Sequence, residues 1–115
     1  MNAKLSTHVI DTKNGRPAEG VRIDLLEVTS EGERHLMTVF TNADGRTAQP
    51  LLLGASMKAG DYKLHFHIGD YFYGSAETAP FLTVVPVQFR ISDAEASYHV
   101  PLLTSPWSYS VYRGS

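Results

Sequence analysis

The chain has 115 residues, and we expect residues 1–115 to form a single domain. Hydrophobic residues make up 43% and charged residues 19%, proportions that are typical of a globular protein rather than a disordered one. Ten basic and twelve acidic residues give a net charge of −2, which argues against a nucleic-acid partner bound through bulk charge. The absence of cysteine excludes disulfides, zinc fingers, thiolate catalysis and iron–sulfur clusters.

The N-terminal residues 1–5 lack the apolar stretch of a signal peptide. The longest strongly apolar runs, residues 50–55 and 81–87, are too short to cross a bilayer. We therefore expect a soluble, cytoplasmic protein with no membrane partner.

Alternation of apolar and polar side chains, the pattern of a half-buried β-strand, recurs along the chain. In residues 5–10, one row is Leu5, Thr7 and Val9 and the other is Ser6, His8 and Ile10. Similar alternation is found in residues 21–26, 62–68, 85–91 and 98–102. Turn residues separate these runs, which predicts an all-β protein, a two-sheet sandwich of seven or eight strands. One short helical turn is expected between Asp70 and Ala79, where the alternation lapses.

Pro86 and Pro101 lie inside two of the predicted strands. Because proline has no N–H to give to a sheet, each one predicts a sheet edge, a bulge or a strand end. An exposed edge pairs readily with another chain, so this pattern favours an oligomer assembled through β-strands.

His8 and His99 are candidates for proton transfer, because imidazole changes its charge near neutral pH. Each lies in the less apolar row of its run, so we expect both to point to an outer sheet face. Two interpretations stay open. They are either surface histidines in water or residues that meet on an outer face covered by a second subunit.

The remaining histidines carry weaker signals. His65 and His67 share one strand face at a spacing that can chelate a metal, but nothing nearby completes a site. We interpret both as solvated strand histidines. His35 lies next to charged residues near a turn and is expected to be exposed.

Residues 42–45 read Asn-Ala-Asp-Gly, a sequence typical of a tight turn. Gly45 is expected to supply a positive φ, which leaves Arg46 presented on a rigid corner. The guanidinium of Arg46 is either solvated or offers its planar fork to a carbonyl or an anionic ring. Residues 107–115 keep aromatic side chains to the end, which predicts a docked tail or a last edge strand.

Six segments together carry a family signature: LSTHV (5–9), GRPAEGV (15–21), TNADGR (41–46), YHVPLL (98–103), SP (105–106) and YRGS (112–115). In these segments the chain resembles the transthyretin-like family, and in particular its 5-hydroxyisourate hydrolases. The terminal YRGS is the most specific element, because it separates the hydrolases from transthyretin proper. Val111 departs from the pattern, since the family often has threonine there.

The resemblance implies a transthyretin-like two-sheet sandwich that forms a homotetramer, a dimer of dimers, with active sites in the channel where the dimers meet. It implies hydrolysis of 5-hydroxyisourate to 2-oxo-4-hydroxy-4-carboxy-5-ureidoimidazoline during urate degradation to allantoin, with no metal and no cofactor. The catalytic residues that it implies are His8, Arg46, His99 and Ser115. The substrate-binding residues that it implies are His8, Arg46, Tyr112 and Arg113.

Two other classes of function stay open at this point. One is a carrier that binds an aromatic ligand in the same channel, and the other is a sandwich module without a ligand. A carrier has no need of two histidines, an arginine and the YRGS end together, which favours the hydrolase.

Overall fold

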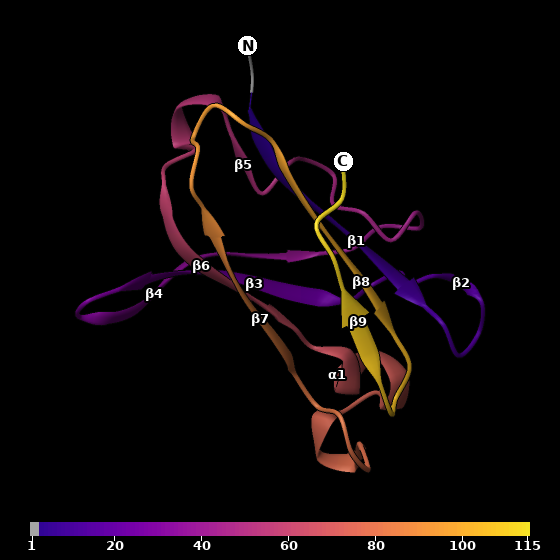
Figure 1. Ribbon diagram of the computed structural model, residues 1–115. Coiled ribbons are helices and arrows are strands. Elements are labelled where there is room, and N and C mark those ends of the chain that lie inside the picture. Colours follow the sequence, from indigo (N-terminus) through magenta and orange to yellow (C-terminus); the bar gives the residue numbers. More distant parts are fainter. Residues whose placement is uncertain (1–2) are drawn as a thin grey trace.

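The computed structural model describes residues 3–115, which form two β-sheets packed face to face (Figure 1). The strands found within these residues are β1 (Lys4–Asp11), β2 (Arg16–Pro17), β3 (Arg22–Thr29), β4 (Gly32–Phe40), β5 (Leu52–Leu53), β6 (Gly60–Phe66), β7 (Val85–Ile91), β8 (Tyr98–Thr104) and β9 (Tyr109–Val111). The helical segments are α1 (Ile68–Tyr73) and two 3-10 turns, η1 (Gly54–Ser56) and η2 (Ala76–Thr78). The predicted all-β sandwich with one short helix is confirmed. The strand number exceeds the prediction because β2 and β5, of two residues each, are too short to show alternation.

The first sheet has the strand order β2-β1-β8-β9, and β5 also pairs with β1. Strands β1 and β8, far apart in the sequence, run parallel in a register that places Ser6 opposite His99 and His8 opposite Pro101. Strand β9 then pairs antiparallel with β8. The second sheet is antiparallel throughout, with the order β4-β3-β6-β7.

The core lies between the two sheets, and the alternation in β1 decides which side chains enter it. Leu5 and Val9 are fully buried and Thr7 is 2% exposed, whereas Ser6 and His8 are only partly buried on the opposite face. A β-strand sends successive side chains to opposite faces, so the apolar row holds the sheets together. The polar row is left on the outer face, where it is available for chemistry.

Both prolines occupy positions that tolerate a missing N–H. Pro86 lies on β7, which is the edge of its sheet. Pro101 lies in β8, on the side that faces β9, between two separate pairings. Leu102 on one side of it pairs with Val111, and His99 on the other forms an isolated bridge with Gly114. The prediction of a sheet edge, a bulge or a strand end is therefore confirmed for Pro86, whereas Pro101 lies inside the central strand β8.

The helix α1 lies at one end of the sandwich (Figure 1) and begins two residues earlier than predicted. Ile68, the last apolar residue of the alternating run, is its first residue and is fully buried. Gly74, at a φ of 79°, ends the helix in a left-handed conformation. No helix among residues 3–115 is long and apolar enough to cross a membrane.

The prediction of a solvated His67 is wrong. The chain leaves β6 at this residue and turns into α1, and its imidazole Nε2 lies 2.8 Å from Asp24 Oδ2 with only 17% of the side chain exposed. His35 is exposed as predicted, with 54% of its side chain accessible.

Asp24 is the carboxylate that joins β3, β4 and the start of α1. Its side chain is 10% exposed and accepts hydrogen bonds from Thr38 Oγ1 at 2.6 Å and Arg22 Nε at 3.3 Å, in addition to its contact with His67. Burial raises the pKa of this carboxyl, but hydrogen bonds from Thr38, His67 and Arg22 outweigh burial and hold the pKa at about 2.

This low pKa predicts a loss of stability in acid. Because the folded state binds the Asp24 proton less readily than the unfolded chain, the stabilisation is complete above pH ~4 and disappears as the pH falls towards 2. It amounts to roughly 2 kcal/mol of unfolding free energy. Urea denaturation at pH 6, 4 and 2.5 should therefore show a shallower acid loss in Asp24→Asn than in the wild type. Equal acid slopes in the two proteins would refute this assignment.

Candidate active site

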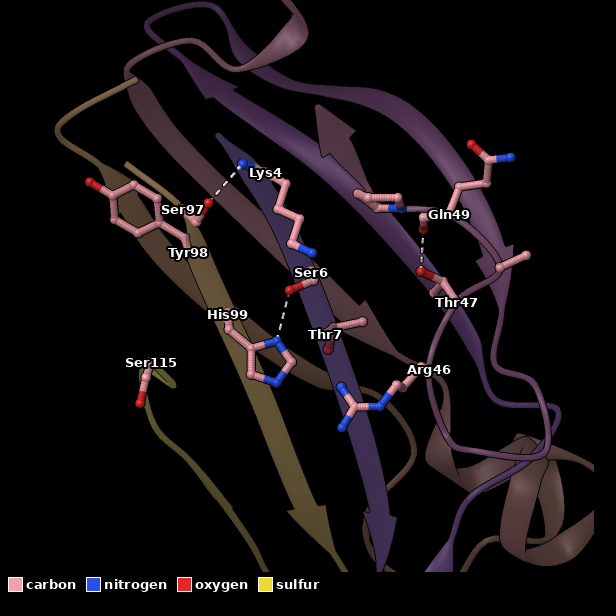
Figure 2. Close-up of a pocket in the computed structure, with 12 residues that line it drawn as sticks. Lys4, Ser6, Thr7, Arg46, Thr47, Gln49, Ser97, Tyr98, His99 and Ser115 are labelled. Carbon is pink, nitrogen blue, oxygen red and sulfur yellow. Dashed lines mark hydrogen bonds between the residues drawn. The ribbon is translucent and has the colours of Figure 1, made fainter. Parts of the chain in front are cut away.

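Polar side chains gather on the outer face of the β1–β8 pair, around a cavity of about 480 Å³ (Figure 2). Its lining includes Lys4 and Ser6 of β1, His99 of β8, Arg46 of the loop that follows β4, and Ser115 of the C-terminal tail. No acidic side chain is among the described residues that line it. The cavity therefore presents cations, hydroxyl groups and one imidazole to any molecule that enters.

His99 is the titratable group at the centre of this arrangement. Its Nδ1 lies 2.8 Å from Ser6 Oγ, and Figure 2 shows the rest of the ring turned toward Arg46. Burial lowers the pKa of His99, and the positive charges of Arg46, His8 and Lys4 lower it further. This lowering favours the uncharged imidazole at neutral pH. If Nδ1–H donates to Ser6, Nε2 keeps the free lone pair that accepts a proton.

Arg46 is placed by a turn whose geometry matches the sequence prediction. Gly45 has a φ of 75°, as predicted, and its carbonyl accepts a hydrogen bond from Val9 N of β1 at 2.8 Å. Asn42 closes the turn, because its side-chain oxygen accepts from Asp44 N at 2.9 Å and Arg46 N at 3.2 Å. The loop is thus tied to β1 immediately before Arg46, and the guanidinium extends from it toward His99 (Figure 2).

His8 projects from the same outer row of β1, two residues after Ser6, and lies beside the cavity lining rather than within it. Its Nε2 donates a hydrogen bond to the carbonyl oxygen of Asp44 at 2.9 Å. This contact fixes the ring against the turn that carries Arg46. When the His8 ring is neutral, this hydrogen bond leaves Nδ1 as the nitrogen that can accept a hydrogen bond.

The structure separates the predicted tail residues into two groups. Arg46, His99 and Ser115 line the same cavity, and His8 lies beside it against the turn that carries Arg46. Tyr112 and Arg113 instead line a second cavity of about 310 Å³, which also includes side chains of β7.

Sequence reasoning missed several residues that line the cavity: Lys4, Ser6, Thr47, Gln49 and Ser97. The signal for Lys4 and Ser6 was present, because they continue the outer row of His8 at intervals of two residues. Thr47 and Gln49 lie in an irregular loop and Ser97 precedes β8, so strand periodicity could not place them.

The comparison with known families gives one result that covers nearly the whole chain. Residues 5–114 match the model described as the HIUase/Transthyretin family. The chain belongs to the HIUase/transthyretin family. This match confirms the family resemblance that the sequence predicted, and it agrees with the two-sheet sandwich of the structure.

Relatives within this family carry different names. The chain is 50% identical over 113 residues to a 5-hydroxyisourate hydrolase of Deinococcus radiodurans, which covers 96% of this chain and 95% of the relative. A solved (S)-allantoin synthase superposes with a TM-score of 0.90 at 40% identity over 99% of this chain, which spans only 44% of that longer protein. Sea bream transthyretin, solved in complex with thyroxine, superposes with a TM-score of 0.85 at 26% identity, covering 97% of this chain and 95% of its own.

The turn before Arg46 supplies a test of how the site is held. A Cβ on Gly45 would lie 2.4 Å from the carbonyl oxygen of Val9, whereas one on Gly20, at a similar φ of 83°, would meet nothing within 4 Å. Gly45→Ala should therefore lower the unfolding free energy by roughly 1–3 kcal/mol more than Gly20→Ala. Urea denaturation of the two variants measures this difference. Equal losses would show that the close approach to β1 is unimportant.

Proposed function

We propose that this chain catalyses the hydrolysis of 5-hydroxyisourate to 2-oxo-4-hydroxy-4-carboxy-5-ureidoimidazoline in the degradation of urate to allantoin. The observation that carries the proposal is the imidazole of His99 beside the guanidinium of Arg46, in a cavity that no acidic side chain of the described residues lines. The identity of 50% to the Deinococcus radiodurans hydrolase supports the same substrate. The identity of 26% to the thyroxine-binding transthyretin gives weaker support to a carrier.

Water opens a cyclic amide when its oxygen bonds to the carbonyl carbon and the ring C–N bond then breaks. We assign the proton acceptor for this water to His99, because its lowered pKa favours the uncharged imidazole and Ser6 holds Nδ1. The water proton passes to Nε2 as the new C–O bond forms. Ser6 is then a positioning residue that orients the ring.

Arg46 is proposed to bind the carbonyl oxygen that becomes negatively charged during the attack. Its guanidinium offers several N–H donors in one plane, and the turn at Gly45 holds its backbone in place. The departing ring nitrogen needs a proton, and we assign its return to His99 and His8, a choice that the register of β1 with β8 supports. Ser115 is proposed to hydrogen-bond the substrate. All proton transfers are thus assigned to side chains, so the proposed reaction needs no metal.

The proposed active form is a homotetramer, a dimer of dimers. Within the described residues β7 and β9 end their sheets without a further partner, and such edges pair readily with a second copy. The cavity opens on the outer face of the β1–β8 pair, so that a second dimer placed over this face would close it into a channel. His8, which lies beside the cavity, would then face the channel together with His99.

The first test measures the ultraviolet decay of 5-hydroxyisourate, generated in place from urate by a uricase. The wild-type protein should accelerate the decay, also after dialysis against EDTA, and His99→Ala should lose on the order of 10²–10⁴-fold in kcat. His8→Ala should lose activity as well, whereas His35→Ala, on the other sheet, is the matched control. Decay at the spontaneous rate, from a tetramer verified by sedimentation, would reject the hydrolase and favour the carrier.

The role of Arg46 predicts a loss that charge alone cannot restore. Arg46→Lys keeps the positive charge but replaces the planar fork with a single ammonium, so kcat/KM should fall on the order of 10²-fold. Arg34→Lys, at an exposed arginine paired with Glu27, should change little. Near-wild-type turnover of Arg46→Lys would remove Arg46 from the mechanism.

A further inference from the structure

The guanidinium of Arg113 is engaged by Ser97 and Tyr98 at the start of β8, and Arg113 itself is not among the residues that line the active-site cavity. Its Cζ lies 4.3 Å from the centroid of the Tyr98 ring, and its Nη2 donates to the carbonyl of Ser97 at 3.1 Å. A guanidinium over an aromatic face is attracted by the electrons of the ring. Arg113 is therefore already bound to the protein by two contacts.

The ring that Arg113 covers is a fixed platform. Tyr98 is 7% exposed, and its hydroxyl oxygen accepts hydrogen bonds from Ser92 N at 3.1 Å and Asp93 N at 3.0 Å. Burial and these two contacts hold the ring in one orientation. Arg113, itself an exposed residue, therefore stacks on a ring whose orientation is fixed.

The strand register explains why Arg113 points this way. Leu102 pairs with Val111, and the isolated bridge between His99 and Gly114 keeps the same antiparallel register, so that Arg113 falls opposite the buried Val100. Opposed residues of two paired strands share a face. Arg113 thus belongs to the inner side, with Tyr98, and Gly114 to the outer side, with His99.

Gly114 lies directly against the imidazole. Its N–H donates to the carbonyl of His99 at 2.8 Å, and a Cβ on Gly114 would lie 2.6 Å from Cδ2 of the His99 ring. Any larger residue would force the ring or the tail to move. The residue after Gly114 is Ser115, which lines the cavity.

We propose that Arg113 is a positioning residue that clamps the C-terminal tail through Tyr98 and Ser97, so that Gly114 covers the His99 ring and Ser115 reaches the cavity. This role differs from the substrate contact that the family resemblance implies for Arg113. The inference deepens the proposed function. The clamp itself is a feature of the substrate-free protein, so it can be tested without substrate.

The clamp has a consequence for the titration of His99. Burial is the largest cause of the low pKa of His99, and the tail supplies part of that burial. The charged groups that lower the pKa of His99 are Arg46 on its loop and His8 and Lys4 on β1, and none of them belongs to the tail. Release of the tail should therefore raise the pKa of His99 towards that of a solvated histidine.

The experiment compares Arg113→Ala, Gly114→Ala and the control Arg34→Ala, an exposed arginine on the other sheet, as full-length proteins. Histidine ring signals are followed by NMR over pH without substrate, and kcat and KM are measured with 5-hydroxyisourate. We expect a higher pKa for His99 in both tail variants, and a fall in kcat on the order of 10²-fold that exceeds any rise in KM. The control should show neither change. Arg113→Lys, which keeps a cation over the ring, should recover part of both losses.

The outcomes separate the clamp from the proposed function. An unchanged titration of His99 in Arg113→Ala, together with a raised KM, would overturn the clamp and make Arg113 a substrate contact. A shifted titration in a protein whose wild type does not hydrolyse 5-hydroxyisourate would uphold the clamp and reject the proposed function. Gly114→Ala keeps Arg113, so it tests the contact between Gly114 and the His99 ring even if Arg113→Ala fails to fold.

Discussion

The site depends on the parallel pairing of β1 with β8. These strands lie at opposite ends of the sequence, yet their register sets Ser6 directly beside His99 and His8 two residues further along the same face. The apolar row of β1 fixes that register, because a slip of one residue would turn Leu5 and Val9 out of the core. The geometry of the polar face is therefore determined by burial on the opposite face.

Two glycines bring further segments to this face by allowing backbone approaches that a side chain would block. At Gly45 the loop touches the backbone of β1, and at Gly114 the tail touches the ring of His99. The first approach precedes Arg46 and the second precedes Ser115, so each delivers the next residue to the cavity. At Gly45 the close approach adds a steric reason to the positive φ, whereas at Gly114 the reason for a glycine is steric.

Local patterns predicted the parts of the site that local geometry controls. Alternation was enough to place His8 and His99 on outer faces, and an Asn-Ala-Asp-Gly turn was enough to predict the positive φ of Gly45. Pairings between distant segments could not be predicted in this way. The side taken by Arg113 depends on the register of the tail with β8, and the burial of His67 depends on Asp24, a residue of another strand.

The buried Asp24 and the partly buried His99 show the same electrostatics with opposite results. Hydrogen-bond donors and a cation keep Asp24 ionised, which stabilises the contact between β3, β4 and α1. Burial and nearby cations lower the pKa of His99 and so favour its uncharged form. Protonation of the ring therefore costs free energy, but the uncharged ring keeps a lone pair that can accept a proton. In the proposed reaction, negative charge develops on the substrate within reach of the same cations. That charge offsets their repulsion of an imidazolium, so the ring accepts a proton most readily at the moment when the attacking water loses one.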